Sequence, residues 1–166
     1  FGISTDAANE PYKHGMIYFG GGSALVYWQD NRWGASKVFG TKISSSFDGS
    51  GGDYFSNTSI NGQQLSTLDL TQENPKAIHA NNNIFLSFRV EESPNQNLYF
   101  QILNMDLNPI GDAIAISSPT TSKQGFDMTF GEDDFIYYAY SEDYNIYLKK
   151  LNSKRAKIIF LMRALC

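Results

Sequence analysis

Cysteine is almost absent from this sequence, since the only one, Cys166, is the last of 166 residues. An internal disulfide is therefore impossible, and so is a metal site built from several cysteines. Long apolar runs are missing too: the longest, residues 158–162, falls far short of the ~20 residues that a membrane-spanning helix needs. These absences exclude a disulfide-rich scaffold, a cysteine-zinc domain and a transmembrane helix in the sequence given.

Charge is also scarce, because charged residues make up 18% of the chain, and 13 Lys and Arg stand against 17 Asp and Glu. The net charge of −4 leaves no basic footprint, so we expect no nucleic-acid partner. With 42% hydrophobic and 14% aromatic residues, the chain has the composition of a folded protein rather than a disordered one. Its length suits one domain with a substantial core.

Residue 1 is Phe rather than Met, and no charged-then-apolar leader precedes the chain. We therefore expect either a mature product or an excised piece of a longer protein. Asn and Ser are abundant and helix-forming Lys and Glu are few, and this composition is typical of secreted β-rich proteins. The sequence thus predicts a secreted or cell-surface location.

The strongest pattern is an internal repeat in which a four-residue turn separates two β-prone runs. The turns are residues 20–23, 80–83 and 131–134, and they consist mainly of Gly, Asn and Asp, which tolerate the positive φ of a tight hairpin. A polar loop and a third β-prone run follow each pair, at residues 37–43, 97–103 and 145–151. A fourth strand is predicted in each unit, at residues 64–70, 112–117 and 157–162.

Four antiparallel strands in a repeat of about 50 residues predict an all-β fold of β-propeller blades. Residues 1–166 then form a single repeat domain with approximate units 15–70, 76–117 and 126–162. The alternative is a β-sandwich built from the same hairpins. The last segment, residues 154–166, lacks the polar turn residues found in the rest of the chain and is compatible with either a final strand or a short helix.

The first unit carries Trp28, Asp30 and Arg32, followed by a β-prone run at residues 38–43. This pattern resembles the repeat of secreted bacterial β-propeller proteins, whose blades carry a Trp-x-Asp-x-Arg turn. The resemblance implies a propeller fold and secretion more than an activity. Three blades do not close a propeller, which has four to eight. We expect either a longer parent protein or self-association through open strand edges.

The loop after residue 30 offers two interpretations. In the first, Asp30 and Arg32 contact a charged ligand and Trp33 is a stacking platform for a sugar ring. In the second, Asp30 and Arg32 brace the turn through side-chain hydrogen bonds, and this reading is favoured because they belong to the fold signature.

Corresponding loops of the other units also carry charged groups that could bind a ligand. They hold Arg89, Glu91, Glu92 and Asn95 in the second unit, and Glu142, Asp143 and Tyr144 in the third. On a propeller these loops share one face, so their carboxylates could converge into a cation or polyol site. The alternative is a solvated rim.

Residues 46–55 are similar to the Asp-box turn of sialidase-type propellers through Ser46 and Asp48. In that family the turn is a folding element remote from catalysis. Asp48 and Asp53 are weak candidates for a Ca²⁺ site, although no Glu follows at the EF-hand spacing. No other cofactor is expected.

No catalytic residue is assigned, because the only histidines, His14 and His79, are distant in sequence and no Gly-x-Ser-x-Gly elbow occurs. The favoured function is a non-catalytic binding or scaffold module of a secreted or cell-surface protein, recognising carbohydrate or protein. The alternatives are a fragment of a carbohydrate-active propeller enzyme of the sialidase or glycosidase kind, and a structural repeat that spaces other domains.

Overall fold

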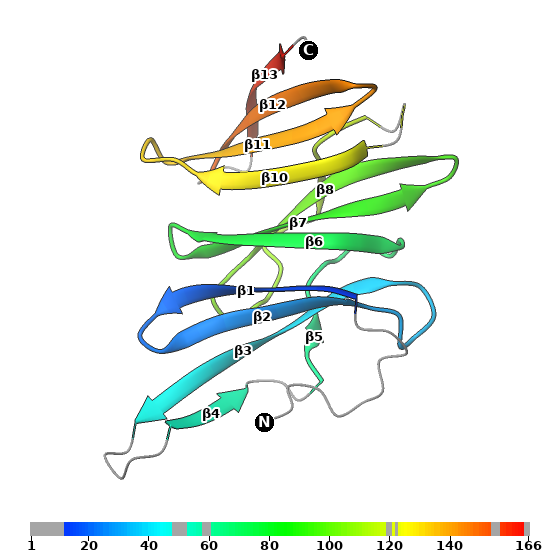
Figure 1. The fold of residues 1–166 in the computed structure, drawn as a ribbon. Helices are drawn as coiled ribbons and strands as arrows, with labels where there is room; N and C mark the ends of the chain where they lie inside the picture. The colour runs from blue at the N-terminus through cyan, green and yellow to red at the C-terminus, as the bar shows by residue number, and fades with distance from the viewer. Residues whose placement is uncertain are drawn as a thin grey trace.

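The computed structural model describes residues 12–47, 53–57, 61–118, 121, 123–153 and 157–164. All the regular structure in this part of the chain is β, arranged as three antiparallel sheets stacked in sequence order (Figure 1). The prediction of an all-β fold with propeller-type blades is confirmed. Within the described residues, no helix suited to crossing a membrane occurs.

Blade 1, as we call the first sheet, contains β1 Tyr12–Gly20, β2 Ser23–Asp30, β3 Lys37–Phe47, β4 Asp53–Asn57 and β5 Gln63–Gln64. Its strand order is β1-β2-β3-β4, and β5 also pairs with β3. β3 is long enough to pair with β4 through its C-terminal half and with β5 through its N-terminal half.

Blade 2 contains β6 Gln72–Ala80, β7 Asn83–Glu92, β8 Asn95–Leu103 and β9 Ile114–Ala115. Blade 3 contains β10 Lys123–Phe130, β11 Phe135–Glu142, β12 Asn145–Asn152 and β13 Lys157–Ala164. Each is a sheet of four strands in sequence order. The C-terminal segment, left open by the sequence, is therefore a strand from residue 157 to residue 164.

The tight turns have the backbone that the sequence predicts. Gly21 and Gly22 join β1 to β2 with φ of 57° and 71°, and Asn81 and Asn82 join β6 to β7 with φ of 48° and 59°. Two consecutive positive φ values are typical of a type I′ hairpin, whose twist matches that of the strands. Glycine and asparagine adopt this conformation at low cost.

The fourth strands differ from the prediction in two blades. β5 and β9 have two residues each, where the sequence suggested strands at residues 64–70 and 112–117. In blade 1 the Leu65 amide still donates to the Val38 carbonyl of β3 at 2.9 Å, and a local turn follows in which Ser66 Oγ accepts a hydrogen bond from the Leu68 amide at 3.1 Å. The first strands begin at Tyr12, Gln72 and Lys123, a few residues before the predicted unit starts at 15, 76 and 126.

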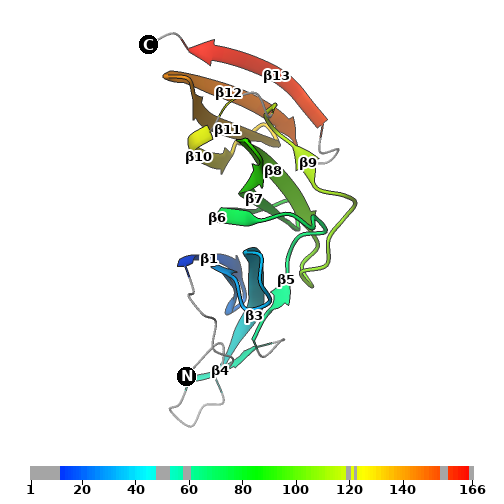
Figure 2. The ribbon, with the colours of Figure 1, turned by 90° about the vertical axis from the view of Figure 1, so that its right-hand side faces the viewer.

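The core lies between the blades, in two clusters of buried apolar side chains. The first joins blades 1 and 2 around Leu25, Val38 and Leu86, and the second joins blades 2 and 3 around Phe100 and Tyr138. The blades form an arc, with β1, β6 and β10 on one side and β5, β9 and β13 on the other (Figure 2). Loops from all three blades therefore gather at shared ends of the stack.

A tyrosine hydroxyl also crosses each boundary. The Ala77 amide donates to Tyr27 Oη at 3.3 Å between blades 1 and 2, and Ser87 Oγ and Tyr138 Oη are 2.7 Å apart between blades 2 and 3. Burial raises the pKa of the Tyr27 hydroxyl, against the opposing effect of the Ala77 hydrogen bond. These bonds fix the relative positions of adjacent blades.

Candidate functional site

The loop between β2 and β3 is braced by Asp30. Its carboxylate accepts hydrogen bonds from Trp28 Nε1 at 3.1 Å, from the Arg32 amide at 2.8 Å and from Arg32 Nε at 2.6 Å. Arg32 Nη1 also donates to the Asn61 carbonyl at 2.9 Å. The Asp30 and Arg32 side chains are 0% and 5% exposed, so the bracing interpretation describes what these two side chains do. A ligand contact by Arg32 stays a prediction.

The electrostatics of Asp30 agree with this bracing. Burial alone raises the pKa of a carboxyl, but the hydrogen bonds from Arg32 and Trp28 outweigh burial and hold the pKa of Asp30 below its usual value. The ionised form is therefore the form that the folded protein stabilises.

Trp33, next to this braced turn, is exposed. Its side chain is 72% exposed, and its ring meets Phe39 edge-on at a centroid distance of 5.1 Å. The Arg32 guanidinium carbon lies 5.7 Å from the Trp33 centroid. Trp33 thus presents an aromatic surface on a loop whose neighbours are held in place.

The corresponding charged residues of blade 2 are engaged within the blade. Arg89 Nε donates to Glu73 at 3.2 Å, and the two side chains form an ion pair. Glu92 accepts a hydrogen bond from the Tyr99 hydroxyl at 2.5 Å. Burial, followed by the nearby Glu92 carboxylate, raises the pKa of Tyr99 to about 12. Glu92 and Arg89 are therefore committed to partners on their own sheet.

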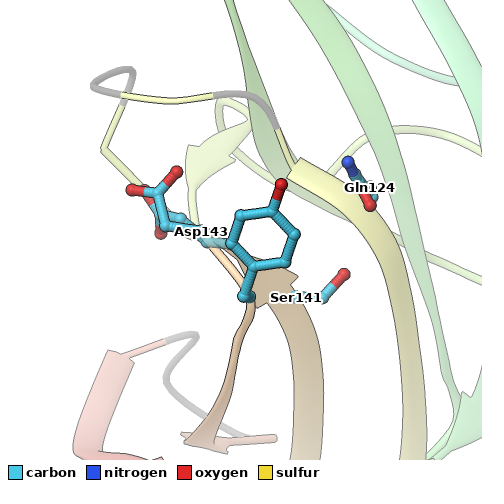
Figure 3. Close-up of a pocket in the computed structure, with 5 residues that line it drawn as sticks. Gln124, Ser141 and Asp143 are labelled. Carbon is cyan, nitrogen blue, oxygen red and sulfur yellow. The ribbon is translucent and has the colours of Figure 1, made fainter.

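A pocket of about 220 Å³ lies beside the hairpin that joins β11 to β12, lined by Gln124, Ser141, Glu142, Asp143 and Tyr144. Asp143 stands on one side of it, and Gln124 and Ser141 stand on the other (Figure 3). Ser141 Oγ accepts a hydrogen bond from the Gly125 amide at 3.0 Å, which ties the hairpin to β10.

Glu142, which lines this pocket, forms an ion pair with a buried lysine. Lys123 Nζ lies 3.0 Å from its carboxylate, Thr121 Oγ1 donates to it, and the Lys123 side chain is fully buried. A buried lysine requires such a partner, because an isolated buried charge is strongly unfavourable. Glu142 therefore has a structural task in addition to lining the pocket.

The tip of this hairpin has the same two consecutive positive φ values as the other tight turns, but with a bulky residue at the second position. Asp143 and Tyr144 have φ of 48° and 62°, in the left-handed region that a residue as bulky as tyrosine rarely occupies. Such a conformation costs roughly 1–3 kcal/mol and persists where the structure or a function requires it. The Tyr144 side chain is fully exposed, so packing does not explain the tyrosine.

The β2–β3, β7–β8 and β11–β12 loops lie at the same end of the stacked sheets (Figure 1). In the part of the chain that the structure describes, no group of three or more His, Cys, Asp or Glu could hold a metal ion. Asp48 lies outside the described residues, as does the side chain of Asp53, so this Ca²⁺ prediction stays untested.

A further pocket, which the sequence did not indicate, lies between the loops of blades 1 and 2. Its volume is about 470 Å³, and Ala35, Asp69, Glu91 and Pro94 are among its lining residues. Gln124 and Ser141 were missed as well, because their proximity to the hairpin tip depends on the pairing of β10 with β11. The signal available beforehand was the position of Asp143 and Tyr144 between two β-prone runs.

No family of known sequences matches this chain, and no curated protein does. Among solved structures, the chain resembles Penicillium chrysogenum α-L-arabinanase complexed with arabinobiose, with a TM-score of 0.53 and 14% sequence identity. The sheets are propeller-type blades. The match covers 93% of this chain and 50% of the arabinanase chain, so this chain spans about half the length of that protein. At this identity the likeness establishes the fold alone.

Proposed function

We propose that this chain is a non-catalytic, carbohydrate-binding segment of a β-propeller in a secreted or cell-surface protein. The observation that carries the proposal is Tyr144, a fully exposed aromatic ring held in a strained backbone over a pocket with polar walls. Because the Tyr144 ring is not buried in the protein, contact with a ligand would explain why an aromatic residue occupies this position. The Asn- and Ser-rich composition supports the location.

The chemistry of the pocket suits a sugar. A tyrosine ring offers an apolar face for the C–H face of a pyranose or furanose and a hydroxyl for hydrogen bonding. Gln124, Ser141 and Asp143 supply an amide, a hydroxyl and a carboxylate, which together can donate to and accept from sugar hydroxyls. Apolar surface with a few convergent polar groups is the usual composition of a small-molecule site.

Trp33 extends this surface along the same end of the molecule. Trp33 belongs to the β2–β3 loop of blade 1 and Tyr144 to the β11–β12 hairpin of blade 3, and both side chains are exposed. The loop and the hairpin lie at the same end of the stacked sheets (Figure 1). Two separated aromatic platforms suit a glycan chain rather than a single sugar, because linked contacts raise the apparent affinity.

A fragment of a carbohydrate-active enzyme is the second candidate, and the likeness to an arabinanase favours it. Glycoside hydrolysis requires two carboxyl groups about 5–9.5 Å apart on either side of the scissile bond. At the ends of β2, β7 and β11, Asp30, Glu92 and Glu142 each contact a cation or a hydroxyl of their own blade, and the neighbouring carboxylates Glu91 and Asp143 line two different pockets. This pairing supports binding without catalysis.

The test is isothermal titration of the full chain with arabinobiose and longer arabino-oligosaccharides, after a glycan array has ranked other sugars. Tyr144→Asn removes the ring while keeping a residue that tolerates the left-handed backbone. We expect Tyr144→Asn and Trp33→Ala each to weaken binding about tenfold, since an aromatic stacking contact is worth about 0.5–1.5 kcal/mol beyond the area that it buries and about 1.4 kcal/mol is tenfold in affinity.

Tyr18→Ala is the matched control, because Tyr18 is 66% exposed and lies on β1 near the opposite end of the blade. Binding that is unaffected by Tyr144→Asn, or equally weakened by Tyr18→Ala, would contradict the proposal. Release of reducing ends from the oligosaccharides would favour the enzyme alternative instead.

A further inference from the structure

The first strand of every blade is interrupted near the same end. The pairing register shifts between Tyr12 and His14 in β1, between Glu73 and Lys76 in β6, and between Lys123 and Phe126 in β10. Lys13 and Asn74, inside the first two interruptions, have φ of 45° and 50°. Such bulges re-aim side chains and occur often beside functional sites.

A cavity of about 480 Å³ opens over these interrupted strands. Residues of all three blades line it: Lys13, His14 and Tyr27 from blade 1, Asn74, Pro75, Lys76 and Ala77 from blade 2, and Asp127 from blade 3. Its volume lies in the range of small-molecule sites, ~300–1,000 Å³. The residues that line the hairpin pocket are different, so the two sites are separate.

One wall of the cavity depends on a glycine. A Cβ atom on Gly15 would lie 2.2 Å from Tyr27 Oη, so a side chain at that position is incompatible with the tyrosine as it stands. The tyrosine ring lies against the bare backbone of Gly15, and its hydroxyl accepts from the Ala77 amide of blade 2. The shape of the cavity is therefore built into the blade interface.

The charge of the cavity is opposite to that of the whole chain. Lys76 Nζ lies 3.1 Å from the Asp127 carboxylate, with the two side chains 44% and 75% exposed. Lys13 and His14 are both exposed beside this pair. Among the described residues that line the cavity, two lysines stand against one aspartate and give an excess positive charge, whereas the protein carries a net −4. A concave surface of one sign concentrates ligands of the other sign.

We propose that this cavity binds the carboxylate of an acidic sugar, with Lys13 as the principal cation and His14 and Asn74 as hydrogen-bonding groups. The cavity has room for more than an inorganic anion, and the Tyr27 ring with Pro75 and Ala77 provides an apolar wall for the rest of the ligand. The inference rests on residues of the first strands and is independent of the hairpin site.

The experiment titrates the full chain with D-galacturonate, D-galactose and inorganic phosphate, followed by amide chemical shifts. We expect galacturonate to bind, galactose of the same size to bind at least about tenfold more weakly, and phosphate to bind more weakly than galacturonate. Binding of galacturonate should weaken between roughly 0.01 M and 1 M salt, as the screening length falls from ~30 to ~3 Å.

Two variants move the affinity in opposite directions. Lys13→Asn removes the charge with a residue that tolerates positive φ, and we expect a loss of about tenfold or more. The Asp127 carboxylate accepts a hydrogen bond from the Met128 amide at 3.0 Å. Asp127→Asn keeps an oxygen that can accept this bond but removes the negative charge next to Lys76. Binding should therefore tighten. Lys42→Gln, on β3 and outside the cavity, is the control and should bind like the parent.

Equal binding of galactose and galacturonate would overturn the proposal, as would weaker binding by Asp127→Asn or equal losses in Lys42→Gln and Lys13→Asn. Phosphate binding as tightly as galacturonate would reduce the cavity to a general anion site and overturn the assignment to an acidic sugar. Tyr144→Asn should leave galacturonate binding here unchanged, which separates this inference from the hairpin proposal.

Discussion

At the end of β2, the two oxygens of Asp30 accept hydrogen bonds from the Trp28 indole, the Arg32 amide and the Arg32 guanidinium. Trp28 is 6% exposed, so this network lies within the folded sheet rather than on its surface. Hydrogen bonds to a charged acceptor in such a setting are stronger than those between neutral groups. The same residues carried the sequence resemblance to propeller blades, and their contacts give that pattern a physical reason.

Removing the carboxylate should therefore be costly. Asp30→Ala leaves the buried Arg32 guanidinium without its counter-charge, and we expect the free energy of unfolding to fall by about 3–5 kcal/mol. Trp33→Ala, at the largely exposed residue directly after Arg32, should change it by less than about 0.5 kcal/mol. Urea denaturation of both variants checks this, and a cost below about 1 kcal/mol for Asp30→Ala would show that the network is not stabilising.

The lowered pKa of Asp30 adds a dependence on pH. Because the folded-state pKa is below the unfolded-state value, the unfolded chain binds more protons, so this contribution is full above the unfolded pKa and is lost as the pH falls through the folded pKa. Stability should thus decline below about pH 4. Urea midpoints between neutral and acidic pH should fall less steeply in Asp30→Asn than in the parent; parallel curves would contradict this.

Among the elements, the hairpins and the outer strand of blade 3 were predictable, and the short outer strands of blades 1 and 2 were not. Glycine and asparagine at residues 20–23 and 80–83 determine a local backbone, so their turns follow from the sequence alone. The segment after β5 is held by hydrogen bonds from the next blade, since the Thr67 amide and hydroxyl both donate to Gln101 Oε1 of β8, at 3.4 and 3.2 Å. Local propensity carries no information about such contacts.

The candidate sites divide in the same way. Trp33, Asp143 and Tyr144 could be named because they lie in loops between β-prone runs. The interruptions of β1 and β6 could not, since a bulge is defined by pairing with another strand. Nor could sequence reasoning bring Lys13 next to Asp127, because their proximity requires three blades stacked in the correct register.

Gly15 provides a test of how two elements fit together. Gly15→Ala forces a methyl group against the Tyr27 ring, and we expect a loss of about 1–3 kcal/mol, as for other overpacked sites. Gly125→Ala, on the corresponding strand of blade 3, is the control, since its Cβ would meet only Ser141 Oγ at an ordinary 3.6 Å. Thermal melts compare the two, and similar melting temperatures would show that Tyr27 is not held by Gly15.

On the scale of the whole molecule, the arc of the three described blades has two outer faces, one on blade 1 and one on blade 3 (Figure 2). Met16 and Tyr18, each 66% exposed, are on blade 1, and Ile146, 49% exposed, is on blade 3. Apolar side chains at these positions resemble those that meet between blades. They support the prediction that the isolated chain self-associates.

A double variant, Met16→Lys and Ile146→Lys, places a charge on each outer face while leaving the cores between blades intact. We expect the parent to form dimers or larger species and the double variant to shift toward monomer, as measured by sedimentation velocity over a range of concentrations. A parent that sediments as a monomer at every concentration would contradict self-association through these faces.

The buried tyrosines at the blade boundaries also provide an ultraviolet absorbance signal for the separation of the blades. Burial raises the pKa of Tyr138 far above its usual value and that of Tyr140 to about 12, so these phenols stay protonated in mild alkali while the blades remain stacked. Once the blades part, the same phenols ionise at ordinary values and add to the ultraviolet absorbance that the exposed tyrosines already give. Separation of blade 3 from blade 2 can thus be followed by light absorption alone, without attaching a dye.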